Sequence, residues 1–325
     1  MNRRNTVLAL LALGATSRIA GAQAATPVIG VLSTNASDAY GASMDAAFAQ
    51  GLRESGVEVG RDVTLEYRRT NGKYDALPAL AEEMVKRGVA VIFAASLPSA
   101  LAVKAATSTI PVVFVMGADP VKLGVVASLP RPGGNITGIS QLYGELGAKR
   151  LEMLRELVPG AKSVGVLSNP KNPNAKDHLD SLKSAAKAIG LPIEALNASS
   201  AADIEAAFAG MARHRINALV IADDPFFTTQ REWIVALTGR HRLPTIHYTR
   251  AFVEIGGLVS YGSDARDNYR LAGGYAARML RGAKPSDLPV LQPTKFELVV
   301  NLKTAKALKL KIPQTLLVRA DRVIE

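Results

Sequence analysis

Polar side chains recur where apolar segments of this chain end, and their types are suited to binding a small charged molecule. Serine and asparagine beside a helix start would lie near exposed N–H groups and the positive helix end, which favour an anion such as a carboxylate. Aspartates at similar positions would favour a cation such as an ammonium. A ligand that carries both charges, such as an amino acid, fits this set. The candidate ligand-binding residues are Ser33, Asn35, Tyr40, Ser96, Ser99, Asp119, Asn169, Asp223, Tyr248 and Tyr261.

Each of these residues also has a purely local interpretation. Ser96, Ser99, Asp119 and Asp223 are good helix N-caps, and the asparagines and prolines of residues 169–174 are ordinary turn residues. The repetition of polar residues at successive strand ends favours a shared cleft. The three tyrosines are candidates for ligand stacking because they adjoin predicted loops instead of apolar stripes.

Sequence motifs for catalysis or metal binding are missing. The chain has no G-x-G-x-x-G after its first strand, no P-loop lysine motif, no G-x-S-x-G and no H-E-x-x-H. The histidines lack metal-ligand spacing; they are His178, His214, His241 and His247. Asp223 and Asp224 are adjacent on a strand end, so their side chains should point apart. We expect no enzymatic activity, no metal and no cofactor.

The elements that must position these residues follow a β-α-β-α order. The apolar runs at residues 27–33, 89–95 and 110–116 predict strands buried on both faces, and amphipathic segments such as 40–55 predict helices between them. This order predicts parallel sheets with helices on both faces. Ligands of such sheets bind beyond the carboxyl ends of the strands, where the strand order reverses.

The pattern of the first half starts again near the middle of the chain. Ile29–Ser33 reads IGVLS and Val164–Ser168 reads VGVLS, and two further strand pairs match in the same order. We therefore predict an α/β protein of two doubly wound parallel-sheet lobes of similar topology. The first lobe would comprise residues 25–140 with about 262–288, and the second 141–261 with about 289–325. The repeated crossing between lobes predicts a multi-strand hinge.

The amino-acid composition excludes or disfavours several classes of protein. The 325 residues, 48% of them hydrophobic, suit two domains. The absence of cysteine excludes a disulfide scaffold and a thiol nucleophile. The formal net charge is +11, but the basic residues are scattered and have no aromatic residues interleaved. This pattern indicates a solvated basic surface and disfavours nucleic-acid binding.

The first 24 residues have the features of an export signal. Arg3 and Arg4 precede an apolar run at residues 6–15, and Ala22-Gln23-Ala24 is a small-x-small cleavage pattern. The apolar run is far shorter than the roughly 20 residues that span a bilayer. We predict cleavage after Ala24 and a periplasmic mature protein.

Several segments resemble a known family. Residues 105–138 (AATSTIPVVFVMGADPVKLGVVASLPRPGGNITG), 256–264 (GGLVSYGSD), 280–290 (LRGAKPSDLPV) and 295–313 (KFELVVNLKTAKALKLKIP) are similar to bacterial ABC-transporter substrate-binding proteins of the tryptophan/tyrosine-binding-like group. The resemblance implies a type I periplasmic-binding fold with a small ligand between two hinged lobes. It also implies an inner-membrane permease with a cytoplasmic ATPase as partners. Residues 246–250 (IHYTR) depart from the more apolar stretch expected there.

Two alternatives stay open at this point, and a third is disfavoured. The same fold could serve as a periplasmic sensor module that presents a ligand to a membrane receptor, or the chain could be a secreted α/β enzyme. A repressor-type regulator would need an N-terminal helix-turn-helix, and an export signal stands there instead. We expect a monomer that closes on its ligand by rotation of the lobes.

Overall fold

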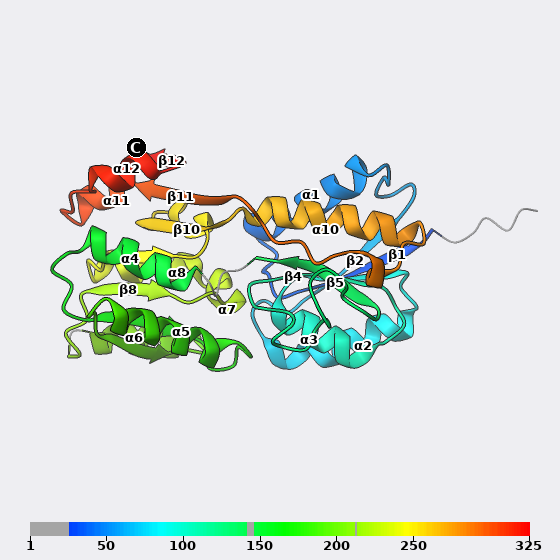
Figure 1. The fold of residues 1–325 in the computed structure, drawn as a ribbon, viewed down its shortest axis with the longest axis horizontal. Helices are drawn as coiled ribbons and strands as arrows, with labels where there is room; N and C mark the ends of the chain where they lie inside the picture. The colour runs from blue at the N-terminus through cyan, green and yellow to red at the C-terminus, as the bar shows by residue number, and fades with distance from the viewer. Residues whose placement is uncertain (1–25, 142–145, 212) are drawn as a thin grey trace, which may run out of the picture.

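Two α/β lobes lie side by side in the computed structural model, which describes residues 26–141, 146–211 and 213–325 (Figure 1). The first lobe contains a sheet of order β2-β1-β3-β4-β5, in which every pairing is parallel. Its strands are β1 (Val28–Ser33), β2 (Thr64–Arg69), β3 (Val91–Ala94), β4 (Val112–Met116) and β5 (Ile136–Ser140). Its helical segments are α1 (Ala39–Glu54), η1 (Tyr74–Ala76), α2 (Leu77–Arg87), α3 (Leu97–Ala106), α10 (Ala265–Leu280) and η2 (Pro285–Asp287).

Helices cover both faces of this first sheet, as its continuous apolar strands require. Phe48 of α1 stacks on Phe93 of β3 at 4.4 Å, within a core that α10 completes. On the other face, α2 and α3 pack against alternate residues of the same strands, for example Ile92 and Phe114. The sheet of the first lobe is therefore held between two hydrophobic cores.

Helix α10 comes from late in the chain and lies along α1 (Figure 1). The approach is close because glycine stands at the contact on both helices. A Cβ added at Gly51 would lie 1.8 Å from the carbonyl oxygen of Arg270, and one at Gly273 would lie 2.1 Å from that of Phe48. The late segment is therefore built into the first lobe.

The second lobe contains a sheet of order β12-β11-β10-β9-β8-β6-β7. Its strands are β6 (Val164–Ser168), β7 (Ile193–Asn197), β8 (Ala218–Ile221), β9 (Thr245–His247), β10 (Val259–Ser263), β11 (Phe296–Asn301) and β12 (Arg322–Ile324). Its helices are α4 (Gly147–Leu157), α5 (Ala175–Ala188), α6 (Ala201–Met211), α7 (Pro225–Thr229), α8 (Arg231–Arg240), α9 (Arg250–Val253), α11 (Leu302–Ala307) and α12 (Gln314–Arg319). Separate cores again lie on the two faces of the sheet.

The duplicated topology predicted from the sequence is confirmed. Strands β7-β6-β8-β9-β10 repeat the order β2-β1-β3-β4-β5, and the IGVLS and VGVLS segments are the equivalent strands β1 and β6. The chain passes from β10 of the second sheet to α10 of the first lobe across Asp264, and it returns to the second sheet at β11. The exact lobe boundaries inferred from the sequence stay a prediction.

The expectation of wholly parallel sheets was wrong for the second lobe, because strand β11 pairs antiparallel with β10. After Asp119, residues 120–129 form turns and bends, in which the carbonyl oxygen of Pro120 accepts from the backbone N–H groups of Val125 and Val126. Helices α7 and α8 follow one another and are separated at Gln230.

The predicted export signal and the cleavage site after Ala24 lie outside the described residues. Within the part of the chain that the structure describes, no helix combines the length and the apolar character that a bilayer crossing needs.

Candidate functional site

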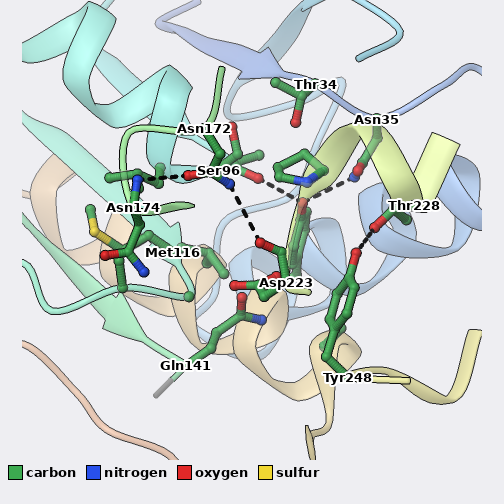
Figure 2. A pocket seen from close by; sticks show the side chains of 18 of the residues that line it. Thr34, Asn35, Ser96, Met116, Gln141, Asn172, Asn174, Asp223, Thr228 and Tyr248 are labelled. Carbon is green, nitrogen blue, oxygen red and sulfur yellow. Dashed lines mark hydrogen bonds between the residues drawn. The ribbon is translucent and has the colours of Figure 1, made fainter. Parts of the chain in front are cut away.

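A cavity of about 70 Å³ lies between the carboxyl ends of the two sheets. This volume is several times what a single buried water needs. The first lobe contributes the loops after β1, β3, β4 and β5, and the second those after β6, β8 and β9. The polar side chains converge on one another from both lobes (Figure 2). They are Thr34, Asn35, Tyr40, Ser96, Gln141, Asn172, Asn174, Asp223, Thr228, Tyr248 and Tyr269.

The β1 loop is anchored to α10 on the first-lobe side of the cavity. Asn35 Nδ2 donates to the hydroxyl of Tyr269 at 3.0 Å, and that hydroxyl donates to the carbonyl oxygen of Ala95 at 3.2 Å. Neighbouring Thr34 is fully buried, and its Oγ1 has no hydrogen-bond partner among the described residues. A buried hydroxyl without a partner is costly, and Thr34 lines the cavity, where a ligand would supply a partner.

The start of α3 forms a second part of the first-lobe wall. Ser96 is the N-cap of this ten-residue helix, and its Oγ accepts from the backbone N–H of Ser99 at 3.3 Å. The two serine hydroxyl oxygens lie 2.8 Å apart. Ser96 lines the cavity, whereas Ser99 supports it from behind. Hydroxyls at the positive end of a helix suit a negatively charged group.

Asp223, two residues after the end of β8, is the acidic side chain of the described cavity wall. Its carboxyl group has no hydrogen-bond partner among the described residues and is partly accessible to the cavity. Burial raises the pKa of Asp223 to about 7, against the opposing effect of the Arg150 guanidinium, and neighbouring Asp224 raises it further. A positively charged ligand group would supply the missing partner and stabilise the carboxylate.

Asp224 faces away from this position and is fully hydrogen-bonded. It accepts from Nδ2 of Asn169 at 3.1 Å, from Nδ2 of Asn172 at 2.7 Å and from the backbone N–H of Phe226 at 2.9 Å. Burial raises its pKa to about 6, and these donors oppose the rise. The adjacent aspartates therefore have different surroundings, as the alternation of side chains along a strand requires.

Aromatic hydroxyls complete the cavity wall. Tyr40 comes from α1, and burial raises its pKa to about 12. Tyr248, after β9, contacts Thr228 through its hydroxyl, which also donates to the carbonyl oxygen of Asp224 at 2.8 Å. Burial likewise raises the pKa of Tyr248. Both side chains are neutral hydrogen-bonding groups at physiological pH.

The structure brings five of the ten sequence-predicted residues together in the cavity wall. These are Asn35, Tyr40, Ser96, Asp223 and Tyr248.

The other five do not line the cavity. Ser33 binds the backbone N–H of Asn35, Ser99 lies behind Ser96, and Asn169 holds Asp224. Asp119 is exposed, and its carboxylate accepts from the backbone of its own turn at residues 121 and 122. Tyr261 lies in β10 with its ring 6.3 Å from that of Phe296.

The ten predicted residues leave out several lining residues. Asn172 and Asn174 belong to the NPKNPN loop, whose polar position after β6 the sequence shows, but they were not among the ten. Gln141 likewise follows β5 directly. Tyr269 lies within a helix, and no local pattern signals that it would reach the other strand ends. Apolar residues such as Met116 also line the wall.

Metal chemistry finds no support in the described ranges, which contain no cluster of three or more histidine, aspartate or glutamate residues able to hold an ion. The cavity wall, as far as it is described, also contains no lysine, arginine or histidine. Asp223 is therefore the titratable acid of the wall as described.

Comparison with known proteins places residues 28–324 on a family model described as ABC transporter substrate binding protein. A tyrosine-binding protein of Clostridioides difficile (strain R20291) is 28% identical over 264 residues, which cover 81% of this chain and 76% of that protein.

Solved structures agree with the family model. A conserved domain protein from Vibrio cholerae matches with a TM-score of 0.85 at 27% identity, covering 92% of this chain and 99% of the other. An ABC domain from Streptococcus pneumoniae, in complex with L-Trp, matches with a TM-score of 0.83 at 26% identity, covering 92% and 100%. The ligand-free, open form of a substrate-binding protein with adhesive properties from Clostridium difficile matches with a TM-score of 0.64 at 24% identity, covering 92% and 99%.

Proposed function

Since this chain belongs to the ABC transporter substrate-binding protein family, we propose that it captures a free amino acid in the cavity between its lobes. Proteins of this family bind a small ligand and work with an ABC transporter. The tyrosine-binding protein and the L-Trp complex among its relatives support an amino acid as the ligand class.

The observation that carries this proposal is the carboxyl group of Asp223, which has no hydrogen-bond partner among the described residues, in a cavity wall with no described basic side chain. A purely anionic ligand would meet the negative charge of Asp223, which the Arg150 guanidinium offsets in part from outside the described lining. An ammonium group would instead form the charge-assisted hydrogen bonds that Asp223 lacks. The hydroxyls of Ser96 and Thr34, on the opposite lobe, are suited to the ligand carboxylate.

Binding across the cavity would couple ligand capture to lobe closure. The ammonium contact belongs to the second lobe and the carboxylate contact to the first, so only the closed arrangement offers both. A ligand shifts the equilibrium toward closure by the difference between its affinities for the two states. The closed form would then dock on an inner-membrane permease with a cytoplasmic ATPase, and we propose that the exported, monomeric protein does this in the periplasm.

The direct test is calorimetry with L-tyrosine and L-tryptophan on the wild type and on Asp223→Asn. Loss of one partner of a buried, hydrogen-bonded charge pair costs about 2–5 kcal/mol, which is roughly 30-fold or more in Kd. Asp119→Asn is the matched control, because Asp119 is an exposed acid outside the cavity. Equal affinity of wild type and Asp223→Asn would contradict the ammonium assignment. A screen in which small dicarboxylates bind and amino acids do not would contradict the ligand class.

A further inference from the structure

The lobes also touch each other through side chains outside the cavity. Tyr74 of η1, in the first lobe, donates its hydroxyl hydrogen to Asp224 Oδ2 at 2.9 Å. The same hydroxyl accepts from the backbone N–H of Phe226 at 3.3 Å. Neither Tyr74 nor Asp224 is among the residues that line the cavity. This contact joins the lobes without any ligand.

The acceptor of this contact, Asp224, is already oriented by groups of the second lobe. Asp224 is 1% exposed, and Asn169, Asn172 and the backbone of Phe226 donate to it from within its own lobe. Its carboxylate therefore keeps a fixed orientation whether or not Tyr74 is present. Closing the lobes adds one donor to a preformed acceptor, so little side-chain entropy is lost on the second-lobe side.

A second contact has the same construction. The guanidinium of Arg231 donates to Asp38 Oδ2 at 2.8 Å and lies 5.2 Å from the centre of the Tyr40 ring, both in the first lobe. Arg231 is held in its own lobe by a hydrogen bond to the carbonyl oxygen of Thr228 at 3.0 Å. The side chain of Arg231 is 7% exposed and that of Asp38 is 32% exposed, so this ion pair is less screened than a fully exposed surface pair.

Each of the two contacts involves a residue that touches a side chain of the cavity wall. Asn172 binds Asp224 and also lines the cavity, and Tyr40 lines the cavity beneath Arg231. By contrast, the interlobe pairs Lys122–Asp177 and Lys171–Asp75 are exposed. Exposed pairs contribute little to stability. The contacts that hold the lobes together are therefore the ones that also orient ligand-facing side chains.

We propose that Tyr74–Asp224 and Arg231–Asp38 form a latch that holds the lobes closed in the absence of ligand, so that Tyr74 and Arg231 are positioning residues for a ligand that they do not touch. The latch itself does not depend on the proposed function. Only its expected effect on ligand affinity rests on that function. A larger population of the binding-competent state lowers the apparent Kd in proportion. Asp223 and Asp224 then divide two tasks, with Asp223 facing the ligand and Asp224 facing the opposite lobe.

The test is the distance between spin labels on the two lobes of the ligand-free protein at pH 8. The chain has no native cysteine, so Glu82→Cys on α2 and Lys183→Cys on α5, both exposed, give specific labels. We expect a short interlobe distance in the wild type. Tyr74→Phe removes one hydroxyl bonded to a carboxylate and should shift the ratio of closed to open molecules about tenfold toward open.

Asp75→Asn is the matched control, because it removes an exposed interlobe pair beside the latch. The latch is overturned if the wild type and Tyr74→Phe have the same distance distribution, or if Asp75→Asn opens the lobes as far as Tyr74→Phe. The Kd for L-tyrosine should rise in Tyr74→Phe while the thermal midpoint of each lobe stays unchanged. Failure of L-tyrosine to bind any variant would contradict the ligand assignment, and the ligand-free distances would still decide the latch.

Discussion

The pH dependence of ligand binding should report the titration of Asp223. Burial raises the pKa of this carboxyl to about 7 in the ligand-free cavity, and Arg150 opposes the rise. An ammonium ligand requires the ionised form, so binding below pH 7 must release a proton. The ligand affinity is therefore greatest above the pKa of Asp223 and falls as the pH drops through that pKa.

The size of this effect can be worked out from that pKa. At pH 8 most Asp223 side chains are ionised, and at pH 5, two units below about 7, only about one in a hundred is ionised. If the bound ligand keeps Asp223 ionised, Kd should rise roughly a hundredfold from pH 8 to pH 5. The ammonium group of an amino acid stays protonated over this whole range.

The assay is calorimetry in buffers of different ionisation enthalpy, which also counts the protons released. We expect close to one proton released per ligand at pH 6 and almost none at pH 8. Asp223→Asn should bind weakly, with no pH dependence over this range. A wild-type Kd that stays constant from pH 8 to pH 5, or proton uptake in place of release, would refute the role of Asp223.

Two further predictions concern stability. His247 is fully buried against the ring of Phe252, and burial lowers its pKa from 6.5 to about 3. Because the folded protein keeps this side chain neutral, its contribution to the free energy of unfolding is present above pH 6.5 and is lost as the pH falls below it. His247→Leu should therefore lose about 2 kcal/mol less unfolding free energy than the wild type between pH 8 and pH 5, as measured by urea titration. An equal loss in wild type and variant would contradict this. Gly273→Ala places a methyl group against the backbone of α1 and should destabilise the first lobe by roughly 3 kcal/mol. Gly160→Ala is the control and should change stability little, because open space surrounds Gly160. Equal thermal midpoints for the two variants would count against the close helix contact.

The sequence predicted the strand ends well because each buried strand is a continuous apolar run that stops at a polar residue. Asn35, Ser96 and Asp223 were found in this way, and the structure places all three in one cavity wall. The repeat of IGVLS as VGVLS indicated the matching topology for the same reason. These predictions depend on local patterning and on the geometry common to parallel sheets.

The misses concern residues whose role depends on tertiary placement. Tyr269 reaches the cavity only because α10 returns from the second half of the chain to pack on α1. Asp119 follows β4 as predicted, but its side chain turns outward and caps its own loop. Antiparallel β11 is another case, because a single strand sequence does not specify the direction of its neighbour. Long-range packing decides all three.

The central claim is that the cavity holds one small molecule with an amino group against Asp223. Native mass spectrometry of protein purified without denaturation tests this most directly, with the released molecule identified by its exact mass. We predict one bound amino acid per chain in the wild type and in Asp119→Asn, and none in Asp223→Asn. A bound compound that lacks an amino group, or one retained equally by Asp223→Asn, would contradict the account.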